Sequence, residues 1–280
     1  MSLKAVRRVW REFIRHKAAL ISLIFLIVVV ISTVLAPFIA PSDPNIITRD
    51  IFFTPSWTHL MGTDNLGRDM FSRIIWGARV SLLVGVVAGL IAISVGTLVG
   101  SISGYFGGKI DDLLMRFTDA FMVVPTFFLI LLIVFMFGST ILNIMIVIGL
   151  TTWSQTARVA RAEFLSLRER EFVEAARLSG CSDFRIIYRH ILPNALPPII
   201  AMTTLRIGGA ILNEAALSFL GLGDVNKVTW GLMLHFSLRY FRIAWWMTLF
   251  PGLAIFLVVL SLNLIGDGLN AALNPQLRHR

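Results

Sequence analysis

Residues that could do chemistry are sparse in this chain, and most of the polar ones gather between positions 168 and 194. That stretch is rich in arginine and separates two of the longest apolar runs. The sequence lacks a glycine-rich phosphate loop followed by Lys-Ser or Lys-Thr, a His-Glu-x-x-His ligand pair, paired cysteines and a Gly-x-Ser-x-Gly turn. We therefore expect no catalytic residue, no metal site and no cofactor in this chain.

The arginine-rich stretch is predicted to form two short helices joined at a glycine. From Glu169 to Ser179, apolar and small residues recur at helical spacing and form one face, at Phe172, Ala175, Ala176 and Ser179. Gly180 suits the left-handed conformation that ends a helix, and Ser182 or Asp183 can cap the next helix. Pro193 is expected to stop that second helix. The hairpin is either an ordinary surface feature or a docking surface for another protein.

A second polar set lies inside an apolar run. Arg206, Asn213 and Glu214 fall between Pro197 and Gly221, a segment that rises about 37 Å as a helix and can cross a membrane. An arginine or an acid near the centre of such a helix costs about 2.5 to 3.5 kcal/mol, so these side chains should avoid lipid. They either pair across helices or line a solute pathway. We expect Arg206, near mid-depth, to line the pathway.

Composition sets the class of protein. Of the 280 residues, 56% are hydrophobic, and the mean hydropathy is +0.80, which is far above the soluble average and predicts an integral membrane protein. The net charge of +9 comes from basic residues in the loops, where membrane topology explains them and nucleic acid is not required. The single cysteine, Cys181, cannot form an internal disulfide.

The apolar runs predict an all-α protein with about six transmembrane helices. We expect a cytoplasmic tail over 1–17, a first span over 18–40, an extracytoplasmic segment over 41–78, a five-helix core over 79–272 that includes a cytoplasmic loop at 159–195, and a cytoplasmic tail over 273–280. Basic residues flank the first span and fill the 159–195 loop, which places both termini in the cytoplasm of a multi-pass cell-membrane protein.

Local patterns add five expectations. Leu113 to Phe137 should cross as one helix, and Arg116 and Asp119 within it, three residues apart, should pair. Thr63 or Asp64 should cap the second span, and Pro251 should open the last one. Glycines recur along the second span at four-, seven- and eight-residue intervals, which predicts close helix packing.

Three motifs resemble known proteins. Glu174-Ala175-Ala176, Gly180 and Ile191-Leu192-Pro193 resemble the EAA loop of ATP-binding cassette (ABC) importer permeases, although His190 stands where that pattern often has an aliphatic residue. Residues 60–69, reading LMGTDNLGRD, together with residues 72–83 resemble a signature of the dipeptide, oligopeptide and nickel permeases. Residues 251–253 and 263–267, reading PGL and NLIGD, also match that family. The signature at residues 60–83 is either an interfacial elbow or a contact with substrate.

The resemblance implies the fold of a type I ABC importer permease and a set of partners. These are a second homologous permease, two ABC ATPase subunits that hold ATP and magnesium, an extracytoplasmic substrate-binding protein, and membrane lipid. The residues expected to contact the ATPase are Glu174, Ala175, Ala176, Gly180, Leu192 and Pro193. Di- or oligopeptides are the expected substrate, while nickel and oligosaccharides remain alternatives. A membrane-embedded enzyme and a channel or secondary transporter are the competing classes.

Overall fold

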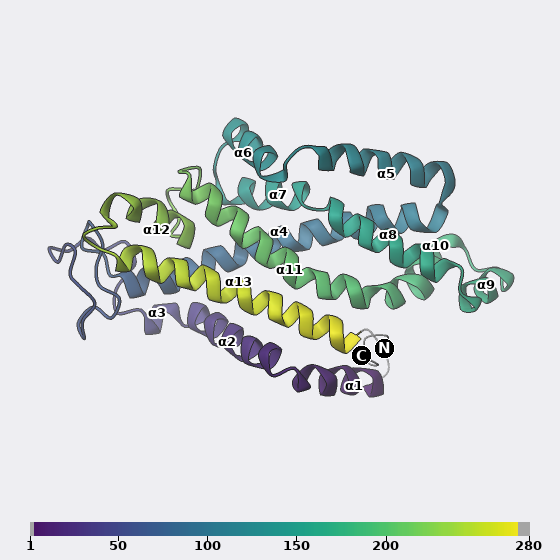
Figure 1. Cartoon of the computed structure of the whole chain (residues 1–280), viewed down its shortest axis with the longest axis horizontal. Helices are drawn as coiled ribbons and strands as arrows, with labels where there is room; N and C mark the ends of the chain where they lie inside the picture. The colour runs from purple at the N-terminus through teal and green to yellow at the C-terminus, as the bar shows by residue number, and fades with distance from the viewer. Residues whose placement is uncertain (1–2, 274–280) are drawn as a thin grey trace.

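The computed structural model describes residues 3–273 and forms an elongated helical bundle (Figure 1). An isolated antiparallel bridge joins Thr63 to Asp69 in the segment before α4. The helices are α1 Leu3–Arg15, α2 Lys17–Val34, α3 Ala36–Ile39, α4 Met70–Phe106, α5 Gly108–Val123, α6 Thr126–Phe137, α7 Ile141–Thr151, α8 Ser154–Arg168, α9 Glu171–Leu178, α10 Asp183–Arg185, the π-helix η1 Ile186–Ile191, α11 Leu192–Phe219, α12 Trp230–Ser237, the 3₁₀-helix η2 Leu238–Tyr240 and α13 Trp246–Leu273. Most of the predicted tail 273–280 lies outside the described residues.

The long helix α4 is the axis on which the others pack. It has 37 residues, and α7, α8 and α11 lie along it (Figure 1). Its glycines form two contact stripes: Gly85 and Gly89 face α11, whereas Gly96, Gly100 and Gly104 face α8. A Cβ atom added at Gly104 would lie 2.6 Å from Cβ of Phe164, closer than packed carbons allow. The predicted role of glycine in close helix packing is confirmed.

Four helices among residues 3–273 are long and apolar enough to cross a membrane: α2, α4, the continuous helix Asp183–Phe219 and α13. The bent pair of α5 and α6 makes a fifth if it is one broken span. The remaining predicted span corresponds to α7, which has 11 residues and rises only about 16 Å. After a break at Thr152 and Trp153 the chain continues along α4 as α8 (Figure 1).

Prolines explain three departures from prediction. The expected straight helix from Leu113 to Phe137 is bent by 80°, because Pro125 has no N–H and holds Val124 in an extended conformation. Pro193 does not stop a helix: it stands in the first turn of α11, just after the π-helix has changed the hydrogen-bond register. Pro251 lies inside α13 and does not open it, a position that transmembrane helices tolerate.

The segment before α4 is held in place by a dense set of polar contacts. The side chain of Asp64 accepts hydrogen bonds from the backbone N–H of Leu66 (2.9 Å) and of Arg68 (3.0 Å) and from Nε of Arg68 (2.6 Å). Asp69, and not Thr63 or Asp64, caps α4, since it accepts from the N–H of Ser72. Because α4 begins at Met70, the helix enters the predicted extracytoplasmic range 41–78. These contacts are those of an elbow that holds the start of α4.

Candidate functional site

The arginine-rich stretch forms a hairpin, defined here as residues 171–191, at one end of the bundle (Figure 1). Gly180 joins its helices with a φ of +74°, and Ser182 caps α10 by accepting from the N–H of Arg185, so both turn predictions are confirmed. The predicted apolar and small face of α9 is not the face that packs on the bundle. Val173 and Ala176 are buried, whereas Phe172 and Ala175 are exposed.

The outward face of the hairpin is apolar with a carboxylate. Leu178 is 86% exposed and Phe184 is 70% exposed, and Glu174 and Ala175 share this exposure. The ring of Phe184 lies 4.5 Å from that of Tyr188, centroid to centroid. Apolar side chains exposed at the tip of a polar loop are typical of a surface that another protein covers.

The hairpin is fastened to the end of α4. The hydroxyl of Tyr105 donates to Oδ1 of Asp183 at 2.5 Å, and the guanidinium of Arg177 lies over the Tyr105 ring, 5.7 Å from its centroid. Arg168, just before the hairpin, donates to the carbonyl of Gly104 at 3.2 Å, which is one of the carbonyls left open at the C-terminus of α4. These contacts connect the hairpin directly to the C-terminal end of α4.

A second tie joins α8 to α5 at the same end. Nε and Nη2 of Arg161 donate to the two carboxylate oxygens of Asp111, each at 2.5 Å, and the hydroxyl of Ser103 also bonds Asp111. This two-pronged geometry is the strongest arrangement of arginine with a carboxylate. The hydrogen bonds that Arg161 donates to Asp111 raise the pKa of Arg161 above its ordinary value. The ends of α4, α5 and α8 are therefore held together where the hairpin begins.

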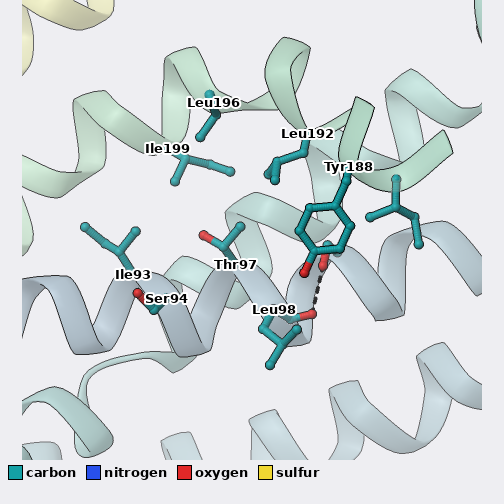
Figure 2. A pocket seen from close by; sticks show the side chains of 10 residues that line it. Ile93, Ser94, Thr97, Leu98, Tyr188, Leu192, Leu196 and Ile199 are labelled. Carbon is teal, nitrogen blue, oxygen red and sulfur yellow. Dashed lines mark hydrogen bonds between the residues drawn. The ribbon is translucent and has the colours of Figure 1, made fainter. Parts of the chain in front are cut away.

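The last two predicted coupling residues, Leu192 and Pro193, lie where the π-helix passes into α11. Leu192 lines a cavity of about 370 Å³ between α4 and the start of α11, whereas Pro193 is exposed to solvent. Figure 2 shows Tyr188 and Leu192 reaching over this cavity toward Thr97 and Leu98 of α4. The hydroxyl of Thr97 is buried, and no residue in the described range 3–273 forms a hydrogen bond with it. Four of the six predicted coupling residues, Glu174, Ala175, Ala176 and Gly180, lie in α9 and the turn that follows it. The other two, Leu192 and Pro193, lie at the base of the hairpin, where α11 begins.

Of the predicted pathway residues, Glu214 is fully buried inside this chain. Its carboxylate accepts from Ser218 at 2.7 Å and from Ser81 of α4 at 3.5 Å. A side chain with no exposure and partners on two helices joins α11 to α4. For Glu214, the geometry favours the alternative of pairing across helices over pathway lining.

Arg206 and Asn213 differ from Glu214 because both are half-exposed. With Gly209 they recur at i, i+3 and i+7 and share one stripe of α11. A Cβ atom added at Gly209 would meet nothing within 4 Å, so this stripe is open. The structure thus separates the three predicted residues, with Arg206 and Asn213 on an open face and Glu214 in the core.

Sequence analysis missed two polar contacts of α8. Asp119 pairs with Arg158 of α8 at 2.6 Å, so the predicted pairing of Asp119 with Arg116 is wrong, because α8 brings a closer cation than the same helix offers. One turn earlier on α8, Oε1 of Gln155 accepts from Nη2 of Arg206 at 2.5 Å. The signal was present in the sequence: Gln155 and Arg158 are three residues apart and therefore share a face.

Comparisons with known proteins assign this architecture to a family. Residues 96–279 match the family model described as binding-protein-dependent transport system inner membrane component, and residues 5–58 match that of the N-terminal transmembrane domain of oligopeptide transport permease C. The di/tripeptide transport system permease protein of Pseudomonas aeruginosa is 39% identical over 98% of this chain and 93% of its own length. The oligopeptide transport system permease protein of Haemophilus influenzae is 40% identical over 95% of this chain and 87% of its own length.

The fold has a counterpart among solved structures. The methionine ABC transporter MetNI, in an inward-facing conformation, contains a chain that superposes with a TM-score of 0.60 at 17% identity, over 73% of this chain and 98% of that one. The match supports the ABC importer permease fold deduced from the motifs. Taken with residues 96–279, which fit the family model, it means that the chain belongs to the family of inner membrane components of binding-protein-dependent transport systems and is a multi-pass permease subunit of an ABC importer.

Proposed function

We propose that this permease forms half of a translocation pathway for di- or oligopeptides. The substrate is supported by relatives whose names specify di/tripeptide and oligopeptide transport and which align with this chain over nearly its whole length. The other half of the pathway is a second, homologous permease. An extracytoplasmic binding protein delivers the peptide, and two ABC ATPase subunits, which hold ATP and magnesium, supply the energy.

The observation that carries the proposal is the exposed apolar tip of the hairpin. Leu178 and Phe184 lie in the open, and Glu174 beside them can accept hydrogen bonds from an ATPase surface. Gly180 sets the turn, Ala175 and Ala176 permit close approach because they are small, and Leu192 and Pro193 connect the hairpin to α11. The hairpin docks in the ATPase, which places it and both chain termini on the cytoplasmic side. In keeping with this, α1 and the end of α13 lie toward the hairpin end of the bundle (Figure 1).

The ties at the hairpin base suggest how ATP hydrolysis moves the pathway. When the ATPase subunits close, they displace the hairpins of the two permeases. Tyr105 and Arg168 pass that displacement to α4, and the π-helix passes it to α11. Both helices then shift relative to the second permease, and the pathway opens alternately to the two sides of the membrane.

The test replaces Gly180 with valine in the complete complex. Because φ is +74° at this position, a β-branched residue is strained there, and the hairpin should lose its docking geometry while the bundle stays inserted. We expect Gly180→Val to reduce peptide uptake and peptide-stimulated ATP hydrolysis at least about tenfold, which corresponds to the few kcal/mol that such backbone strain costs. Uptake into proteoliposomes and phosphate release measure the two effects.

Gly180→Asn is the matched control. Asparagine tolerates the left-handed conformation, and nothing lies within 4 Å of a Cβ atom at this position, so this variant should keep most of the activity. If Gly180→Val transported as fast as the unchanged protein in an assembled complex, the docking role of the hairpin would be refuted. Uptake of nickel or an oligosaccharide, with no uptake of any peptide, would contradict the proposal that the substrate is a peptide.

A further inference from the structure

The open stripe of α11, defined above as Arg206, Gly209 and Asn213, places two polar side chains on the partly exposed side of the helix, whereas the neighbouring Glu214 is buried in the bundle. Its neighbours on the exposed side are Leu205 and Leu212, which are 39% and 48% exposed and suit lipid. An arginine and an asparagine on a lipid-facing surface would be costly. The glycine between them leaves room that no residue between positions 3 and 273 fills. The stripe therefore faces the space between the two permeases.

Arg206 is a cation without a counter-ion in the described part of this chain. Its Nη2 donates to the neutral amide of Gln155, and its Nε is buried and has no hydrogen-bond partner among the residues that the structure describes. The contrast with Arg158, one turn further along α8 from Gln155, is direct: Arg158 is neutralised by Asp119 at 2.6 Å. Gln155 thus orients the Arg206 guanidinium and leaves its charge available. A planar guanidinium fits a carboxylate through two parallel hydrogen bonds, and Gln155 accepts from only one of the nitrogens of Arg206.

We propose that Arg206 receives the carboxylate of the substrate as it passes between the two permeases, with Gln155 as the residue that positions it. This inference rests on the proposed function, since it concerns a solute that crosses along α11. A peptide with a free C-terminus carries the carboxylate that Arg206 lacks. The permease then selects for that group after the binding protein has released the peptide, and a peptide amide passes more slowly.

The experiment compares dialanine with dialanine amide in proteoliposomes that hold the complete complex. Each is supplied at a concentration that saturates the isolated binding protein, so that any remaining difference arises after delivery. The unchanged complex should carry dialanine about tenfold faster than the amide, as expected for one charge-assisted hydrogen-bonded pair. Arg206→Gln should bring this ratio close to one, and Arg206→Lys should retain most of it. Arg158→Gln, which removes a cation that is already paired, should leave the ratio unchanged.

The outcomes separate this inference from the proposed function. If the complex carries neither dialanine nor its amide, the peptide substrate is wrong. If it carries dialanine but Arg206→Gln keeps the ratio of the unchanged complex, peptide transport stands and the role of Arg206 is wrong. If Arg206→Gln and Arg206→Lys yield only dissociated subunits on size exclusion, Arg206 pairs with an acid of the second permease, which also overturns the inference.

Discussion

Glu214 is the residue whose burial most limits its role. Because its carboxylate is fully buried and accepts from Ser81 and Ser218, Glu214→Ala would remove the acceptor of both hydroxyl protons. We expect this variant to lose about 1 to 3 kcal/mol of stability, which a thermal melt of the purified complex detects. Glu214→Gln keeps an acceptor in place and should melt closer to the unchanged protein. An alanine variant with normal melting but altered peptide selectivity would instead place Glu214 on the pathway.

Single residues were predictable where local chemistry alone determines them. The positive φ of Gly180 and the cap at Ser182 follow from the sequence, because each depends on its own few neighbours. The partners of Asp119 and Arg206 do not, because they come from α8, and only the packed bundle brings that helix close. For the same reason the sequence could not separate buried Glu214 from half-exposed Arg206, eight residues earlier on the same helix.

At the scale of the elements, replacing either of two glycines with alanine is expected to have opposite effects on the melting temperature. Gly100 of α4 lies against α8, and an added Cβ atom would come within 2.7 Å of Cβ of Ala160. Gly100→Ala should therefore lower the melting temperature by pushing the helices apart. Gly209→Ala should not lower it, because the added methyl group meets nothing in this chain and alanine favours a helix. If Gly209→Ala destabilises the assembled complex, the second permease packs on this stripe and no space remains there.

The element boundaries that the sequence misplaced are those where proline or a break interrupts an apolar run. Hydropathy counts apolar residues, and a run such as Leu113 to Phe137 satisfies it whether the helix is straight or bent by 80°. The sequence pattern predicts that Pro251 begins a helix and that Pro193 ends one, because in water a helix seldom continues through proline. Both prolines are helical here. The buried Pro251 lies in a bundle that shields its backbone from water, whereas the exposed Pro193 stands in the first turn of α11, a position where proline is tolerated.

At the scale of the whole molecule, the orientation in the membrane is a prediction that labelling can test. With Cys181 replaced by serine, single cysteines at Asn45, Asn226 and Ser166 occupy exposed positions. We expect an impermeant maleimide added outside intact cells to label positions 45 and 226 but not 166, because the basic 159–195 loop stays in the cytoplasm. Labelling of position 166 from outside would mean that the orientation is the reverse of the predicted one and that the hairpin cannot reach an ATPase in the cytoplasm.

The unequal lengths of α2 and α4 determine which helix responds to bilayer thickness. The 18 residues of α2 rise about 27 Å, close to the roughly 30 Å of a hydrocarbon core. The 37 residues of α4 rise about 55 Å, which is much longer than that core is thick. In lipids with longer acyl chains, α2 must reduce its tilt or the bilayer must become thinner around it. The long helix α4 and the hairpin attached to its end need no such adjustment. Lipid chain length should therefore change the tilt and depth of α2 in the membrane and leave the contact with the ATPase unaltered.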